Sequence, residues 1–309
     1  MSDLETAIAA HRRELYAHCY RMLGSVQDAE DALQDALLGA WSGFATFAGR
    51  SSVRTWLYRI ATNACLKLAT KRGTRWRSYD LVPARSDVDD LGAPLTELFI
   101  EPLVGDPGEQ LERRESVELA FIAALQHLPP QQRAALLLCD VLELSSAEAA
   151  DTLDTTVAAI NSALQRARAT IEQRVQRDEL AQLDAPAQRE LATKLAGAWE
   201  RADYPAMMSL LAEDVRFAMP PLPAWFDGKD NVGRFLRERV FATPWRLLPR
   251  TVNGQLGFAC YMGQPDGSFA LGAINAIRVR GGQVAEIAGF LDPALYEYFG
   301  LAKNLPADR

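Results

Sequence analysis

The spacing of apolar residues changes along this chain, and that change limits the folds it can adopt. Through residues 6–75, and again through residues 111–178, apolar side chains recur every three to four residues, as in amphipathic helices. Between residues 185 and 305, two helical stretches lead into short segments in which apolar and polar residues alternate, as in strands. The pattern predicts a multidomain protein with two all-α blocks followed by an α+β block.

A stretch without periodicity separates the two helical blocks. Residues 76–110 contain four prolines and three glycines, and eight carboxylates against two arginines. We expect a flexible acidic linker there, whose few apolar residues (Leu95 and Leu98 to Ile100) allow part of it to dock on a surface. The chain thus divides into residues 6–75, 76–110, 111–178 and 185–305.

Charge and composition exclude several classes of protein. The formal net charge of −7 argues against a freestanding, tight DNA binder, because affinity for duplex DNA comes largely from neutralising phosphates. Residues 1–75 are the exception, with ten Lys/Arg against seven Asp/Glu. The sequence has no apolar run of membrane-spanning length and no secretory h-region, so we expect a cytoplasmic protein. The four cysteines lie far apart without metal-ligand spacing, so we expect reduced thiols and no metal or cofactor.

Two helices carry residues suited to nucleic acid. The first is opened by the segment G49-R-S-S-V-R-T-W, where Ser51 or Ser52 is a good N-cap. The second ends a short-helix, tight-turn, long-helix pattern that runs from about Ser145 to Val175, which is the helix-turn-helix arrangement. Its outer face is small and polar, so the helix fits a DNA major groove.

Three parts of the sequence resemble known families. The run Y20-R-M-L-G-S-V-Q-D-A-E-D-A-L-Q-D-A-L-L-G-A-W, followed by F47-A-G-R-S-S-V-R-T-W-L-Y-R-I-A-T-N-A-C, resembles region 2 of extracytoplasmic-function (ECF) sigma factors of the sigma-70 family. The run from L128-P-P-Q-Q-R to I171 resembles region 4 of the same family. The segments D214-V-R-F, D227-G-K-D-N and F290-L-D-P-A-L resemble SnoaL-like, cone-shaped members of the NTF2-like superfamily.

The resemblance implies a sigma factor. Such a protein binds core RNA polymerase through the clamp helices of the largest subunit and the flap, directs the enzyme to promoters and assists melting of the −10 element. The SnoaL-like domain is then expected to modulate this activity through an intramolecular contact with the sigma domains. In this family the linker threads the active-site cleft and RNA exit path, where its carboxylates would mimic RNA charge; a solvated tether is the open alternative.

The resemblance also assigns residues to three interfaces. The polymerase-binding face holds Asp28, Asp31, Gln34 and Asp35, and its last three follow i, i+3, i+4 helical spacing. The expected −10 contacts are Arg50, Ser51, Ser52, Arg54, Arg59, Asn63, Lys67 and Lys71. The expected −35 contacts are Thr156, Asn161, Ser162, Gln165, Arg166 and Arg168. The aromatic residues Trp41, Phe44 and Trp56 are assigned to packing, because aromatics on a helical stripe are usually core.

Region 4 of this family commonly has a glycine before the short helix and another in the turn. Here Glu143 and Asp154 hold those places. Aspartate tolerates the left-handed conformation moderately well, so we expect the fold to survive.

Two other classes of function remain open. One is a freestanding, ligand-sensing DNA-binding regulator that works without polymerase. The other is a SnoaL-like enzyme of the cyclase or isomerase type, with Asp214, Asp227, Asp230 or Glu286 as a general base. No histidine lies in the C-terminal block and no carboxylate pair has diagnostic spacing, so we expect no catalytic residues. Aromatic and apolar residues such as Phe217, Met219, Trp225, Phe226, Phe258 and Tyr261 either line a pocket or form core.

Overall fold

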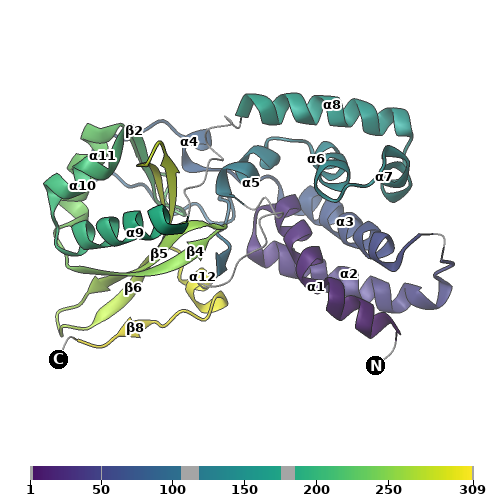
Figure 1. Cartoon of the computed structure of the whole chain (residues 1–309), viewed down its shortest axis with the longest axis horizontal. Helices are drawn as coiled ribbons and strands as arrows, with labels where there is room; N and C mark the ends of the chain where they lie inside the picture. Colours follow the sequence, from purple (N-terminus) through teal and green to yellow (C-terminus); the bar gives the residue numbers. More distant parts are fainter. Residues whose placement is uncertain (1–2, 50, 106–117, 175–184, 308–309) are drawn as a thin grey trace. The chain divides into compact units, whose positions relative to one another are not determined.

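The computed structural model describes residues 3–49, 51–105, 118–174 and 185–307. The chain forms two compact units, each assembled from two stretches of sequence (Figure 1). Unit 1 consists of Met1–Arg75 and Arg114–Gln176, and unit 2 of Trp76–Arg113 and Arg177–Arg309.

Unit 1 is helical. Its elements are α1 (Asp3–Leu23), α2 (Val26–Gly43), the turn η1 (Phe44–Thr46), α3 (Val53–Arg72), α5 (Leu119–Gln126), α6 (Pro130–Leu136), the π-turn η2 (Leu137–Val141), α7 (Ser146–Thr152) and α8 (Val157–Arg174). Helices α1, α2 and α3 pack against one another around fully buried side chains such as Leu15, Leu33 and Tyr58. Helices α6, α7 and α8 share a second core that includes Leu138, Ala149 and Ile160. Both helical blocks expected from the periodicity are therefore present.

Local capping residues set the ends of the region 2 helices. Gly24, at φ 69°, ends α1, and the Ser25 hydroxyl then caps α2 by accepting a hydrogen bond from the Asp28 amide at 3.1 Å. Ser52 caps α3 in the same way, with the Thr55 amide at 3.0 Å. Of the two serines proposed for that cap, Ser52 makes the contact.

Unit 2 is an α+β domain, as predicted. Its helices are α4 (Ser78–Leu81), α9 (Ala185–Glu200), α10 (Tyr204–Leu210), α11 (Lys229–Phe235) with the π-turn η4 (Leu236–Val240), and α12 (Pro293–Tyr298). Its strands are β1 (Val104–Gly105), β2 (Leu211–Ala218), β3 (Trp225–Asp227), β4 (Trp245–Val252), β5 (Gln255–Gly263), β6 (Phe269–Arg280), β7 (Gln283–Phe290) and β8 (Asn304–Leu305).

The strands form one mixed sheet. Their order is β1-β4-β5-β6-β7-β2-β3, with β8 paired to β6 and with β2 parallel to β7. Helices α9, α10 and α11 cover one face of this sheet (Figure 1) and share a core with it that includes Trp199, Met207 and Phe235. The aromatic residues Phe217, Phe226 and Phe258 belong to this core.

Strand β4 was not among the strands expected from the sequence, and Pro249 lies within it. Proline lacks an N–H and is usually confined to sheet edges. In the described residues β1 pairs with β4 only at Val252 and Thr251, so Pro249 lies beyond the reach of that ladder. The strand tolerates the proline for this reason.

The segment expected as a linker packs within unit 2. Val88 is buried in the main core of the α+β domain, and Leu91 packs against it. The backbone of Arg85 donates to the Trp225 carbonyl at 2.8 Å, and that of Leu95 to the Pro221 carbonyl at 2.8 Å. Docking was expected only for the apolar residues near Leu95 to Ile100, whereas contacts extend over most of the stretch from Trp76 to Gly105.

Candidate functional site

One face of α2 combines acidic, polar and apolar residues. Asp31, Gln34 and Asp35 are all exposed, as the helical spacing predicts. The same face continues through Leu38, which is 69% exposed, and Trp41, which is 50% exposed. Trp41 was expected in the core, so that expectation was wrong. An exposed leucine and tryptophan beside two carboxylates are suited to binding a protein partner that is both basic and apolar.

Asp28 does not belong to this exposed face. Its side chain is buried, and a carboxylate oxygen accepts a hydrogen bond from Arg75 Nη2 at 2.5 Å. Arg72 adds a longer ion pair at 3.6 Å. Asp28 lies in the first turn of α2, where its side chain turns toward the end of α3 instead of solvent. The structure therefore corrects its assignment: Asp28 joins α2 to the end of α3.

A row of polar residues runs along the outside of α3. Arg59, Asn63, Lys67 and Lys71 lie four residues apart and are all exposed. Side chains at this spacing follow one another along a helix face. Among the described residues none of the three cations has a carboxylate partner, so their charges are available to an external anion.

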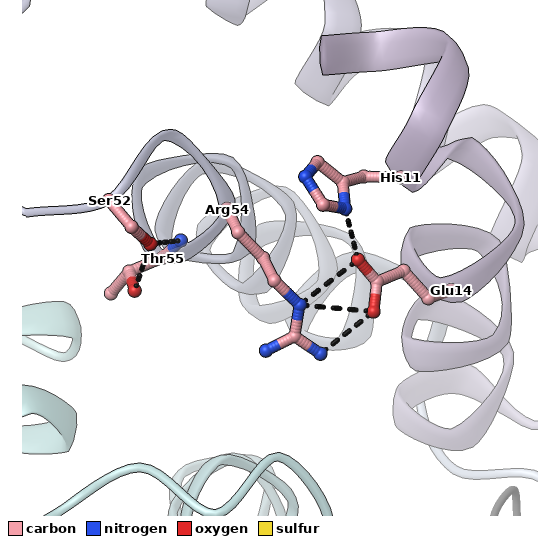
Figure 2. A network of polar contacts seen from close by, with 5 residues as sticks. All are labelled: His11, Glu14, Ser52, Arg54 and Thr55. Atoms are coloured by element: carbon pink, nitrogen blue, oxygen red, sulfur yellow. Dashed lines mark hydrogen bonds and ion pairs between the residues drawn. The ribbon is translucent and has the colours of Figure 1, made fainter.

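Arg54 and Ser52 take part in a polar network at the start of α3 (Figure 2). Arg54 Nη2 donates to Glu14 Oε2 at 2.7 Å, and its guanidinium lies 5.0 Å from the Tyr58 ring centroid. Partial burial raises the pKa of Glu14, but the hydrogen bond and charge of Arg54, together with His11, outweigh burial and hold that pKa below its usual value. Arg54 is therefore tied to α1, unlike the row further along the helix. Ser51 is exposed, and Arg50 lies outside the described residues.

Aromatic side chains support the loop before α3. The Phe47 and Trp56 ring centroids lie 4.9 Å apart, and those of Phe44 and Trp56 lie 6.1 Å apart. Phe44 and Trp56 thus pack as expected. The cluster holds Phe44 and Phe47 against Trp56 in the first turn of α3.

Helices α7 and α8 form the expected helix-turn-helix. Ser162, Gln165 and Arg166 are exposed on α8, and their side chains have no hydrogen-bond partner within the described residues. The remaining three expected −35 residues have internal partners. The Thr156 hydroxyl accepts from the Ala159 amide at the start of α8, Asn161 accepts from the Ser146 hydroxyl at 2.9 Å, and Arg168 pairs with Asp140 at 2.6 Å.

Glu143 and Asp154 adopt the left-handed conformation expected at the two places where a glycine is common. Their φ angles are 58° and 50°. The resemblance therefore located two strained backbone positions correctly, one on each side of α7.

A polar contact between the two helical blocks had no signal in the sequence. Gln126 Nε2 donates to the Arg21 carbonyl, and Arg133 Nη1 donates to the Met22 carbonyl, so side chains of the second block cap the last carbonyls of α1. Both side chains are buried, and burial lowers the pKa of Arg133 to about 10.

The carboxylates considered for catalysis are held by arginines. Asp214 pairs with Arg280, and the hydrogen bond from that arginine lowers the pKa of the aspartate. Glu286 lies 3.1 Å from Arg278 in a buried ion pair. Asp227 lies 3.5 Å from Arg216 and is exposed, as is Asp230. A carboxylate that is paired with an arginine or exposed to solvent is not in the apolar surroundings that suit a general base.

The described residues contain no cluster of three or more His, Cys, Asp or Glu side chains that could hold a metal ion. No helix in the part of the chain that the structure describes has the length and apolar content to cross a membrane.

Comparison with known proteins agrees with this arrangement. The family model for sigma-70 region 2 matches residues 7–75, and the model for sigma-70 region 4 matches residues 118–171. ECF RNA polymerase sigma factor SigG of Mycobacterium tuberculosis is 38% identical to this chain over 319 positions, covering 98% of the chain and 85% of the relative. SigJ of the same organism is 30% identical, covering 92% and 90%. The crystal structure of SigJ aligns with a TM-score of 0.65 and 26% identity, covering 94% of this chain and 98% of that one.

The fold and its exposed faces define a transcription initiation factor of the sigma-70 type. The chain belongs to the family of ECF RNA polymerase sigma factors, and the similarity to SigG and SigJ extends over its C-terminal α+β domain. It binds core RNA polymerase and promoter DNA and directs the enzyme to promoters.

Proposed function

We propose that the exposed face of α2 is the surface that binds core RNA polymerase. Asp31, Gln34 and Asp35 supply charge for clamp helices with basic side chains, and Leu38 and Trp41 supply apolar area that becomes buried on binding. The observation that carries the proposal is the exposure of a large aromatic residue and a leucine in line with two exposed carboxylates. Asp28 contributes indirectly, by holding α2 to the end of α3.

We further propose that α3 and its loop hold the −10 element during melting. Arg59, Lys67 and Lys71 neutralise phosphates, and Asn63 contacts a base or sugar between them. Ser51 and the loop from Phe47 to Ser52 form the place for an unstacked base. Arg50 stays in this proposal from the sequence alone, and Arg54 acts mainly by fixing α3 to α1.

The −35 element is proposed to meet α8. Ser162, Gln165 and Arg166 are the direct contacts, because their side chains are exposed and have no partner among the described residues. Asn161 and Arg168 contact DNA only after exchanging their bonds to Ser146 and Asp140. Thr156 fixes the start of the reading helix.

We keep four functional divisions of the chain, which are residues 6–75, 76–110, 111–178 and 185–305. Region 4 is assigned to the flap, and the C-terminal SnoaL-like domain is assigned a regulatory role without catalysis, exerted through contact with the sigma part of the chain. RNA polymerase works in the cytoplasm, so we place this protein there.

The arginine partners of Asp214 and Glu286 support a regulatory role of the C-terminal domain over an enzymatic one.

The test uses the full chain with purified core polymerase. Asp31→Lys with Asp35→Lys should weaken core binding at least tenfold, as should Leu38→Ala with Trp41→Ala. The control variant, Glu190→Lys with Glu297→Lys, changes the net charge by the same amount on exposed residues of the C-terminal domain. It should bind core polymerase normally. Equal affinity for all three variants would refute the assignment of α2.

A further inference from the structure

The segment between regions 2 and 4 closes on itself through a backbone bridge. The Trp76 amide donates to the Leu98 carbonyl at 2.7 Å, and the Ile100 amide donates to the Trp76 carbonyl at 3.1 Å. Trp76 and Phe99 are thereby paired as a short parallel bridge. Residues 77–98 form a loop that starts and ends at this bridge.

Part of that loop lies over the polar face of the sheet of the α+β domain, while Val88 enters its apolar core. Arg278 on β6, Glu286 on β7, Arg216 on β2 and Asp227 on β3 form a row of alternating charge across four neighbouring strands. Their chain neighbours Phe217, Ile277 and Ile287 lie in the apolar core, so the charged row points to the opposite face. Tyr79 from the loop lies 4.2 Å from the Arg77 guanidinium and 4.9 Å from that of Arg216, measured at its ring centroid.

Other contacts fix the rest of the segment. Trp225 Nε1 donates to the Val82 carbonyl at 2.8 Å, and Asp89 pairs with Arg239 at 2.6 Å. Further along, β1 extends the sheet by pairing with the end of β4. In Figure 1 the blue trace of this segment runs among the green elements of unit 2.

The bridge changes how far apart regions 2 and 4 can lie. From Trp76 to Leu119, where α5 begins, there are 43 residue steps, which allow a span of about 150 Å when fully extended. With the bridge closed, only the 19 steps from Ile100 to Leu119 remain, which allow about 65 Å. Docking on the C-terminal domain therefore removes more than half of the tether.

We propose that the C-terminal domain acts as a clasp on the linker: it keeps residues 76–105 docked, shortens the tether between the two promoter-binding regions, and restrains transcription until polymerase and promoter open it. This inference rests on the proposed regulatory role of the domain and states its direction and its means. Opening the clasp exposes the charged row, the buried side chain of Val88 and the edge of β4, so the free energy of binding polymerase and promoter must drive it.

The first experiment locks the clasp with a disulfide. Trp76→Cys with Phe99→Cys, in a chain carrying Cys139→Ala, places two thiols at directly paired positions, and the remaining native cysteines are buried. Run-off transcription is measured with the oxidised and reduced forms of this variant, after removal of oxidant, and with the Cys139→Ala chain in both conditions. We expect at least tenfold less transcript from the oxidised form than from the reduced one. Equal output from the two forms would overturn the clasp.

A second experiment changes only exposed residues and leaves the hydrophobic core of unit 2 unchanged. Asp89→Arg and Arg239→Asp each replace the ion pair with a repulsion, and the double variant restores it with reversed charges. Each single variant should raise transcription about two- to fivefold, as expected for a surface pair, and the double variant should return to the wild-type level. Single variants that match wild type would contradict the proposal.

Measuring the affinity for core polymerase distinguishes a failure of the clasp from a failure of the proposed function. If the clasp is right, the oxidised disulfide variant still binds core polymerase through α2 but fails to transcribe. If the interfaces on α2, α3 and α8 are wrong, substitutions there leave transcription unchanged whatever the state of the clasp.

Discussion

Arg75 places its guanidinium 2.5 Å from the buried carboxylate of Asp28, which ties the segment just beyond α3 to the first turn of α2. The pair joins the helix proposed to bind polymerase to the helix proposed to bind the −10 element. It explains why Asp28 differs from the other carboxylates of α2 although the sequence places it among them.

Replacing Asp28 by asparagine should destabilise the chain by about 2–3 kcal/mol, because a buried arginine then loses its countercharge. Thermal unfolding followed by circular dichroism should show a midpoint several degrees lower. Asp31→Asn is the matched control, since Asp31 is exposed, and its midpoint should stay within about 1 °C. An unchanged midpoint for Asp28→Asn would show that the ion pair contributes little.

The row on α3 predicts a change in the salt dependence of promoter binding. Arg59→Ala, Lys67→Ala and Lys71→Ala should each lower the slope of log affinity against log salt by roughly one, because each removes one phosphate contact. Asn63→Ala should weaken binding with little change in slope. Fluorescence anisotropy of the holoenzyme on labelled promoter DNA measures both quantities. Slopes that stay at the wild-type value for all three cations would place the DNA elsewhere.

Glu143 and Asp154 predict sites of stabilisation. A side chain in the left-handed region costs about 1 kcal/mol, and glycine avoids that cost while losing part of the gain through chain entropy. Glu143→Gly and Asp154→Gly should therefore leave the free energy of unfolding unchanged or raise it by up to about 1 kcal/mol. Ala169→Gly, in the exposed interior of α8, should lower it by about 1 kcal/mol. A loss of stability at all three sites would contradict the backbone assignment.

His18 predicts a loss of stability in mild acid. Burial lowers the pKa of His18 to about 3, with a further contribution from Arg21, and its Nε2 lies 2.9 Å from the Thr62 hydroxyl. In the unfolded chain this histidine takes up a proton near pH 6.5, and in the folded chain it does not. The stabilisation of the fold by neutral His18 is therefore present above pH 6.5 and is lost as pH falls toward 3. The difference in thermal unfolding midpoint between wild type and His18→Gln should become smaller as the pH is lowered from 7.5 to 5. A constant difference would mean that His18 titrates normally in the folded chain.

Much of the architecture follows from local signals. Serine caps, the helical stripes and the period-two segments located α2, α3, α7, α8 and the long strands β5, β6 and β7. The left-handed positions of Glu143 and Asp154 followed from comparing this sequence with a family pattern. These features depend on residues close in sequence, which is why the sequence alone predicts them.

The features that the sequence did not predict depend on residues that are distant in sequence. Asp28 follows the same helical spacing as Asp31 and differs only because Arg75 lies beside it in space. Strand β4 contains a proline that its position at the sheet edge tolerates. The docking of Val88 and Tyr79 depends on side chains more than a hundred residues later, such as Arg216 and Phe235.

Because Val88 and β1 complete the α+β domain, that domain is discontinuous in the chain. During synthesis, residues 76–105 leave the ribosome well before the strands that receive them, with the whole of region 4 made in between. A fragment that starts at residue 185 would leave the edge of β4 uncovered and open to pairing with another chain. The α+β domain is therefore complete only when residues 76–105 are present with the strands that follow region 4.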